Sequence, residues 1–257
     1  MSYKISKYFI TRDNKRIKYS LSKKNSEIMV VFFHGFMSDM IGEKPKALQN
    51  FCNKNKLDFL RFEYSGHGKS SGEFTKGNIS KWSKEAKELI KSKIKKNNKL
   101  IFIGSSMGSW IALNLFQTFK KKLKGFIGIG SAPEFLENLM WKKFNKKIKK
   151  IILTKKIYNL ESGEFTYPIT KQLIFDGRKN KVLNNKINLQ IPIVLFHGKK
   201  DNIVPISYSK KIFKFFKKSK KKLILIKNGK HSLSRKIDLK KICHELKIMI
   251  EGLPAIK

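Results

Sequence analysis

The chain has 257 residues and a formal net charge of +40, because 58 lysines and arginines are balanced by only 18 aspartates and glutamates. Such a charge ordinarily indicates a polyanionic partner, but 53 of the basic residues are lysines, scattered along the whole chain, and only 5 are arginines. Proteins that read nucleic acids rely on the forked guanidinium of arginine. We therefore expect no specific nucleic-acid partner, and keep weak association with anionic surfaces as an alternative.

No apolar stretch approaches the roughly 18 residues of a membrane-spanning helix, and residues 1–10 lack the apolar core of a secretory signal. The two cysteines, Cys52 and Cys243, have neither redox nor metal-ligand spacing. We therefore expect a cytoplasmic protein that has no transmembrane segment, no metal and no cofactor.

Apolar periodicity predicts alternating strands and helices in one domain. Residues 7–23 are expected to form an antiparallel hairpin around Asp13 and Asn14. Strands are predicted near 27–33, 58–64, 100–104, 125–130, 192–197 and 222–227, and helices near 43–55, 80–95, 107–120, 206–218 and 237–251. This alternation predicts a mainly parallel sheet with helices on both faces, which is an α/β fold.

A G-x-S-x-G motif occupies residues 104–108, between a predicted strand and a predicted helix. A strand that turns abruptly into a helix exposes the central hydroxyl, here that of Ser106. Glycines two residues to either side remove side chains that would crowd the bend. This context makes Ser106 a candidate nucleophile, and a structural serine in a glycine-rich turn is the alternative.

A serine nucleophile needs a base, and the base needs an orienting acid. Asp201 follows the strand near 192–197 and His231 follows the strand near 222–227, in the chain order Ser, Asp, His that accompanies this bend. Loops at the carboxyl ends of parallel strands gather at one edge of a sheet. We therefore expect Ser106, Asp201 and His231 to meet there. The alternative for Asp201 is an N-cap of the helix near 206–218.

Four other histidines compete with His231 for the role of base. His34 and His197 each precede a glycine at a strand end, and His67 lies in a turn-rich loop. We expect these three to shape loops. His244 falls on the predicted C-terminal helix, where a surface or packing role is expected.

Attack on a carbonyl forms an oxyanion that needs backbone N–H donors, each worth a few kcal/mol. One is expected from Met107, directly after the nucleophile. The second is expected from the loop after the strand near 27–33, where Phe36 follows His34 and Gly35.

About 60 residues separate the strand near 125–130 from the strand near 192–197, which is too long for a simple crossover helix. We predict that residues 133–190 form a lid inserted into a core of residues 1–132 and 191–257. Its first part, 135–153, is expected to be a helix with an apolar stripe that lines an acyl pocket or packs on the core. A break at 159–163 and a short helical pattern ending at Lys179 are expected to follow.

Several stretches resemble a known family. They are residues 61–74, 79–82, 104–110, 167–170, 173–178 and 229–234. Together with the Ser106, Asp201 and His231 arrangement, they resemble the α/β-hydrolase superfamily and, within it, the mitochondrial palmitoyl-protein thioesterase of the abhydrolase-domain group and its bacterial relatives. The resemblance implies an α/β-hydrolase fold with an inserted lid, a catalytic triad of these three residues, and Phe36 and Met107 as oxyanion donors.

The resemblance also implies a serine hydrolase that cleaves fatty acyl esters or thioesters, acylated proteins among them, through an acyl-enzyme. One alternative is a carboxylesterase or acyltransferase that acts on small acyl esters or acyl-CoA. Another is a non-catalytic binding module on a hydrolase fold, since a fold alone does not determine function.

Overall fold

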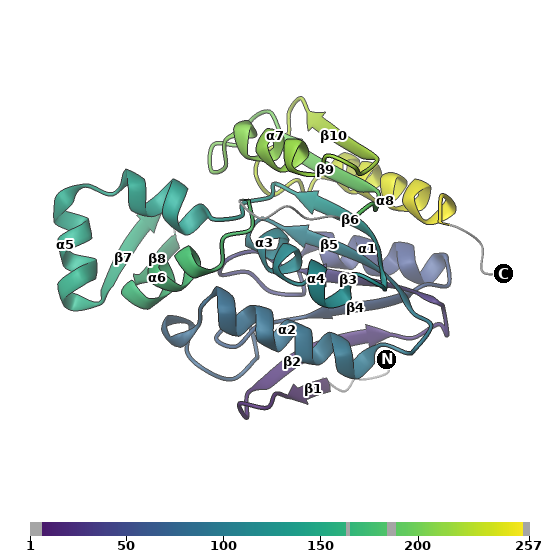
Figure 1. Cartoon of the computed structure of the whole chain (residues 1–257), viewed down its shortest axis with the longest axis horizontal. Coiled ribbons are helices and arrows are strands. Elements are labelled where there is room, and N and C mark those ends of the chain that lie inside the picture. The colour runs from purple at the N-terminus through teal and green to yellow at the C-terminus, as the bar shows by residue number, and fades with distance from the viewer. Residues whose placement is uncertain (1–6, 163–164, 184–188, 254–257) are drawn as a thin grey trace.

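An eight-stranded sheet runs through the described parts of the chain, which are residues 7–162, 165–183 and 189–253 of the computed structural model (Figure 1). Its strands are β1 (Lys7–Ile10), β2 (Arg16–Ser22), β3 (Ile28–Phe33), β4 (Asp58–Phe62), β5 (Lys99–Ser105), β6 (Leu123–Ile129), β9 (Ile193–Gly198) and β10 (Lys221–Ile226). The order is β1-β2-β4-β3-β5-β6-β9-β10. β2 pairs antiparallel with β1 and β4, and every pair from β4 to β10 is parallel. The predicted hairpin, the six predicted strands and the mainly parallel sheet are confirmed.

Helices cover both faces of this sheet, as predicted. One face carries α1 (Glu43–Lys54) and α8 (Lys236–Glu251), and the other carries α2 (Ile79–Lys93), α3 (Met107–Asn114), α4 (Phe116–Phe119) and α7 (Ile206–Phe215). Successive strand residues point to opposite faces, so Phe33 joins the core cluster that contains Trp110, whereas Phe32 joins the one that contains Leu246. The central strands are buried on both sides, which explains their nearly continuous apolar runs.

The helix expected over 107–120 is interrupted at Leu115, between α3 and α4. The Leu115 N–H donates to the carbonyl oxygen of Ala112, three residues back, at 3.0 Å. This tighter turn breaks the regular four-residue pattern of hydrogen bonds.

The segment between β6 and β9 also differs from its prediction. Instead of one helix over 135–153, it contains a π-helical turn η2 (Leu136–Met140), a 3₁₀ turn η3 (Trp141–Lys143) and α5 (Lys146–Lys155). Phe144 is extended, and the Asn145 side chain accepts the Ile148 N–H at 2.9 Å. Asn145 is thus an N-cap that begins a new helix, because its side chain satisfies an otherwise unpaired backbone donor.

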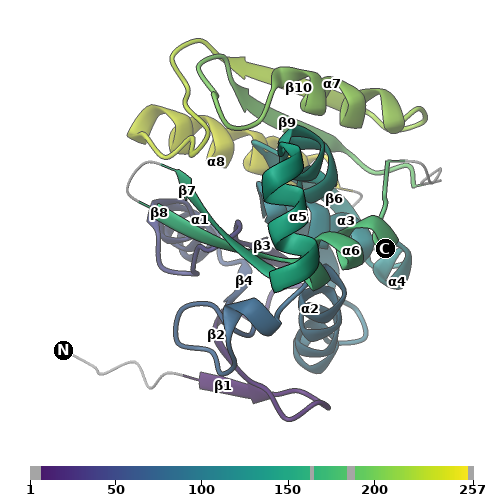
Figure 2. The same cartoon turned by 90° about the vertical axis from the view of Figure 1, so that its left-hand side faces the viewer.

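The break expected at 159–163 is likewise wrong for residues 159–162, which are the part of it that the structure describes. Residues there belong to β7 (Ile157–Ser162), which pairs antiparallel with β8 (Phe165–Thr170), and α6 (Lys171–Lys179) follows as expected. Figure 1 shows α5, β7, β8 and α6 together beside the main sheet, and Figure 2 looks onto this side. Residues 163–164 and 184–188 of the predicted lid, and residues 1–6 and 254–257 of the predicted core, lie outside the described residues. The division into core and lid stays a prediction.

Polar contacts attach the base of this segment to the sheet domain. The Glu134 carboxylate accepts the N–H groups of Val182 and Leu183 at 3.0 and 2.8 Å, which ties the two ends of the segment together. The carboxylate of Asp176 on α6 accepts the Ser80 N–H of α2 at 2.9 Å. These contacts hold α6 against the core, while α5 and the β7–β8 pair lie farther out (Figure 1).

Two of the histidines expected to shape loops are buried side by side. The ring centroids of His34 and His67 lie 5.1 Å apart, and Tyr64 and Trp82 pack against them. Burial lowers the pKa of His67 from 6.5 to about 4. Burial and the neighbouring His67 also hold the pKa of His34 well below its ordinary value. Both rings are therefore neutral at pH 7.

This pair predicts an acid-sensitive fold. Between pH 6.5 and about 4 the unfolded chain binds a proton at His67 that the folded chain does not bind, so the free energy of unfolding falls as the pH falls. The loss from His67 is about 3 kcal/mol, and it is absent above pH 6.5. Denaturant unfolding from pH 7 to 4 should show a weaker pH dependence in His67→Gln than in the wild type. The control is His244→Gln, a change at an exposed histidine, which should keep the pH dependence of the wild type. Equal slopes of the free energy of unfolding against pH in the wild type, His67→Gln and His244→Gln would contradict the prediction.

Candidate active site

Ser106 occupies a strained turn between β5 and α3. Its backbone has φ 51° and ψ −117°, a conformation that costs a residue with a side chain about 1–3 kcal/mol. The motif glycines make the turn possible. A Cβ at Gly108 would lie 2.1 Å from the carbonyl oxygen of Phe33, and one at Gly104 would lie 2.5 Å from the Ser109 Cα. Since these neighbours are backbone atoms, the crowding predicted from the sequence is present in the structure.

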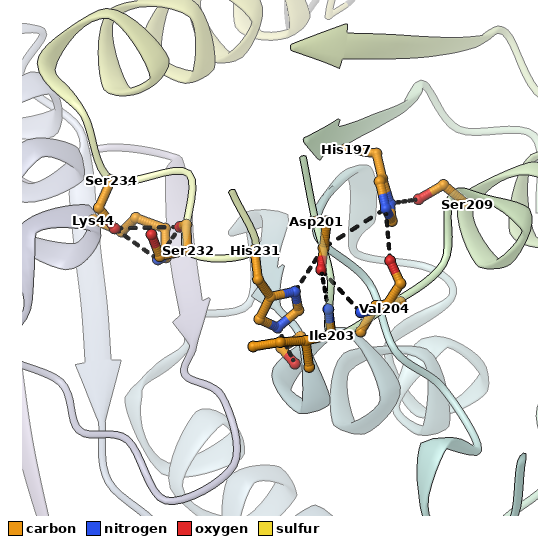
Figure 3. A network of polar contacts seen from close by, with 10 residues as sticks. Lys44, His197, Asp201, Ile203, Val204, Ser209, His231, Ser232 and Ser234 are labelled. Atoms are coloured by element: carbon orange, nitrogen blue, oxygen red, sulfur yellow. Dashed lines mark hydrogen bonds and ion pairs between the residues drawn. The ribbon is translucent and has the colours of Figure 1, made fainter. Parts of the chain in front are cut away.

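The structure brings the three predicted residues together. The Nε2 atom of His231 lies 3.0 Å from the Ser106 hydroxyl oxygen, and its Nδ1 atom lies 2.7 Å from Oδ2 of Asp201. Figure 3 shows the His231 ring beside Asp201, each on a loop that follows a strand. With Nδ1 protonated by its bond to the carboxylate, Nε2 is free to accept the serine proton.

Asp201 is held as an anion with both oxygens in use. Burial raises the pKa of its carboxyl, but the hydrogen bond with His231 and the N–H groups of Val204 and Ile203 outweigh burial, so the pKa lies below its ordinary value. Both backbone groups donate to Oδ1 at 2.9 Å, which leaves Oδ2 for His231. The N-cap of α7 is Pro205, so the alternative role of Asp201 as the N-cap of that helix is wrong. Its Oδ1 instead holds the turn before α7, while its Oδ2 contacts the imidazole.

His197 lies behind Asp201, a position that the sequence analysis did not predict. Its Nε2 atom is 3.0 Å from the Val204 carbonyl oxygen and 3.6 Å from Oδ2 of Asp201, and its Nδ1 atom is 2.8 Å from the Ser209 hydroxyl (Figure 3). Burial lowers the pKa of His197, and the nearby carboxylate offsets this only in part. A neutral His197 that donates to Val204 therefore supports the loop that carries Asp201. In the sequence, the only sign of this contact was that His197 lies four residues before Asp201.

A cavity of about 600 Å³ opens over Ser106 and His231. Part of its wall is apolar and comes from the loop after β3 and from the segment between β6 and β9. These residues are Phe36, Phe135, Leu139, Met140, Leu160 and Tyr167. The Phe36 ring stacks on Tyr167 with centroids 6.0 Å apart, and it meets Phe135 edge to face at 5.3 Å. Of the predicted apolar stripe, Phe135, Leu139 and Met140 line the cavity, whereas Leu136, Phe144 and Ile152 are buried in the core.

The two candidate oxyanion donors flank Ser106. Met107 is the first residue of α3, and Phe36 follows Gly35, where a Cβ would lie 3.5 Å from the Ser106 Cβ. In the described residues, neither the Phe36 nor the Met107 N–H has a hydrogen-bond acceptor. Both amides are therefore available to a ligand, and their role as donors stays a prediction.

Across the described ranges, no group of three or more His, Cys, Asp or Glu side chains is placed to hold a metal ion. None of the helices in these ranges has the length and apolar character needed to cross a membrane. Cys52 and Cys243 are both free thiols.

A mainly parallel sheet with a strained serine at the end of a central strand, followed directly by a helix, defines an α/β-hydrolase. The comparison with known families agrees. Residues 24–164 match the family model described as serine aminopeptidase, S33, and the chain belongs to this family of α/β-hydrolases.

Individual relatives support the assignment. Human mitochondrial palmitoyl-protein thioesterase ABHD10 is 28% identical over 233 residues, which cover 88% of this chain and 74% of that protein. Among solved structures, a protein from Agrobacterium vitis S4 matches with 27% identity and a TM-score of 0.90, covering 95% of this chain and 98% of that one. Mouse α/β-hydrolase domain-containing protein 10 matches with 25% identity and a TM-score of 0.88, covering 97% and 99%. The resemblance to this group of thioesterases, predicted from sequence, is therefore confirmed.

Proposed function

We propose that the protein is a serine hydrolase that cleaves acyl esters or thioesters through an acyl-enzyme on Ser106. The observation that carries this proposal is the continuous hydrogen-bond chain from Ser106 through His231 to Asp201, at the floor of a partly apolar cavity. A thioester substrate is favoured because the ABHD10 relatives are named palmitoyl-protein thioesterases.

Each residue has a defined role in this reaction. The Ser106 oxygen attacks the acyl carbonyl carbon while His231 Nε2 takes the hydroxyl proton, and Asp201 stabilises the resulting imidazolium. The Phe36 and Met107 N–H groups stabilise the negative carbonyl oxygen. The C–S or C–O bond then breaks, and His231 gives its proton to the leaving group. Water, deprotonated by the same histidine, attacks the acyl-serine and releases the acid.

The segment between β6 and β9 is proposed as the lid of this site. It contributes Phe135, Leu139, Met140, Leu160 and Tyr167 to the cavity wall, and burial of an acyl chain against them is worth about 0.8 kcal/mol per methylene. The preference for an acyl chain therefore resides largely in this segment.

Two measurements test the proposal. A fluorophosphonate should attach one phosphonyl group to the peptide that contains Ser106, as read by mass spectrometry.

In matched oxygen esters and thioesters from acetyl to palmitoyl, kcat/KM should rise about fourfold per methylene until the apolar wall is covered. Comparison of the two series decides between thioesterase and esterase, and transfer of the acyl group to an added alcohol or thiol would indicate an acyltransferase. A protein that neither labels nor hydrolyses any member is a binding module, and the proposal would be wrong.

A further inference from the structure

Lys44 lies in the wall of the cavity, on the side of His231 away from Asp201 (Figure 3). It is the second residue of α1. Its ammonium group donates to the carbonyl oxygen of Ser232 and to the hydroxyl of Ser234, the latter at 3.1 Å. Ser232 directly follows His231, so the Lys44 ammonium group contacts the residue next to the proposed base.

The Lys44 charge has no acidic partner close by. Within the described ranges, no carboxylate lies at ion-pair distance from Lys44. Asp238 attracts it from farther away but is itself paired with Arg235 at 2.7 Å. Burial lowers the pKa of Lys44 to about 8, so the group still carries its charge at neutral pH. An ammonium has three N–H donors. The Ser232 carbonyl oxygen and the Ser234 hydroxyl, both neutral, take two of them and leave one for a ligand.

Two carboxylates also line this part of the cavity, one paired with a lysine and the other still charged and close to Arg61, where burial lowers the pKa of the guanidinium and this carboxylate offsets part of that effect. Glu43 pairs with Lys46 at 3.2 Å, and Asp39 accepts the Ile41 N–H at 2.8 Å. The first turn of α1 lies in the same wall, and its N-cap, Gly42, has no side chain to satisfy the N–H groups. The positive end of the helix dipole therefore adds to the field of Lys44.

We propose that Lys44 anchors a subsite for an anionic group, a carboxylate or a phosphate, on the leaving group of the substrate. The inference rests on the proposed function: an acyl chain belongs against the apolar wall, so the leaving group belongs against the polar wall that contains Lys44, Ser232 and Ser234. The overall charge of +40 acts in the same direction, because it draws anionic ligands toward the protein. The lysine ammonium group is a compact point charge, so it can bind either a carboxylate or a phosphate.

Hydrolysis of a matched ester pair tests the subsite. The esters are para-carboxyphenyl octanoate, whose leaving group is anionic, and para-carbamoylphenyl octanoate, which has a neutral group of similar shape. In Lys44→Met, the ratio of kcat/KM for the anionic ester to that for the neutral ester is expected to fall about tenfold, mainly through KM. Lys54→Met removes the same charge from the far end of α1, where the side chain is exposed, and should leave the ratio unchanged. An unchanged ratio in Lys44→Met would overturn the proposal, even if both activities fell because the His231 loop had moved.

Binding separates this inference from the proposed function. The probes are the amide analogues para-(octanoylamino)benzoate, para-(octanoylamino)phenyl phosphate and the neutral para-(octanoylamino)benzamide, measured by calorimetry. At least one charged analogue should bind the wild type about tenfold more tightly than the neutral one and lose that advantage in Lys44→Met. The stronger of the two charged analogues identifies the anion. If the wild type cleaves neither ester but shows this binding pattern, the proposed function fails and the subsite stands. If the charged analogues bind no more tightly than the neutral one, the subsite is wrong whatever the activity.

Discussion

Replacing Ser106 by alanine is expected to lower kcat by at least about 10³-fold, because among the described residues Ser106 is the only one whose hydroxyl is hydrogen-bonded to the base His231. The fold should be unaffected. Alanine retains the Cβ, so the strain at φ 51° is unchanged, and only the hydrogen bond to His231 is lost. The measurements are kcat on para-nitrophenyl octanoate, corrected for spontaneous hydrolysis, and the midpoint of thermal unfolding.

The neighbouring Ser105 provides a matched control for this substitution. It is the last residue of β5, and in the described residues its hydroxyl makes no hydrogen bond with His231. Ser105→Ala should keep kcat within a few-fold of the wild type. Activity near the wild-type level in Ser106→Ala would exclude an acyl-enzyme on this residue.

Replacing Asp201 by asparagine is expected to lower kcat by about 10⁴-fold. Oδ1 of Asp201 accepts two backbone N–H groups, so the amide oxygen of asparagine must take that place and the amide NH₂ must point at His231. The imidazole then has to accept at Nδ1 and carry its proton on Nε2, which faces Ser106. In that tautomer the ring cannot take the serine proton. The measurement is kcat across a pH series on the same ester.

Asp13→Asn makes the same chemical change at an exposed carboxylate that pairs with Lys84 at 2.7 Å and does not line the cavity, and its kcat on this ester should stay within a few-fold of the wild type. A loss in Asp201→Asn no larger than that in Asp13→Asn would show that Asp201 serves the loop and does not orient the base.

The residues expected to carry the chemistry could be found from sequence because each has a local signal. Ser106 lies between two glycines at a strand end, and the structure shows that both glycines are required by backbone contacts under 3 Å. Asp201 and His231 each follow an apolar run, and parallel strands bring the ends of such runs to one edge of the sheet. Their catalytic roles remain predictions that the two substitutions above test.

The segment between β6 and β9 was predicted less well, because some of its apolar residues line the cavity and others pack in the core. A helical stripe over 135–153 was inferred from periodicity alone, yet the Asn145 side chain accepts the Ile148 N–H and caps a new helix, α5, which divides the stripe. Residues near 159–163 were expected to break the structure, but β7 gains its hydrogen bonds from β8. Periodicity cannot reveal such a pairing, since it depends on the register between two strands.

By itself, the sequence determined the class of fold and the candidate nucleophile, acid and base, since apolar periodicity and a glycine-flanked serine depend only on residues close together in the chain. Only the tertiary structure decided what surrounds them. The support of Asp201 by His197, the apolar wall and the position of Lys44 all arise from packing between separate elements. Lys44 meets Ser232 across 188 positions of the chain, and no local pattern marks a contact of that kind. Its place beside His231 follows from how α1 and the loop before α8 pack at the same edge of the sheet.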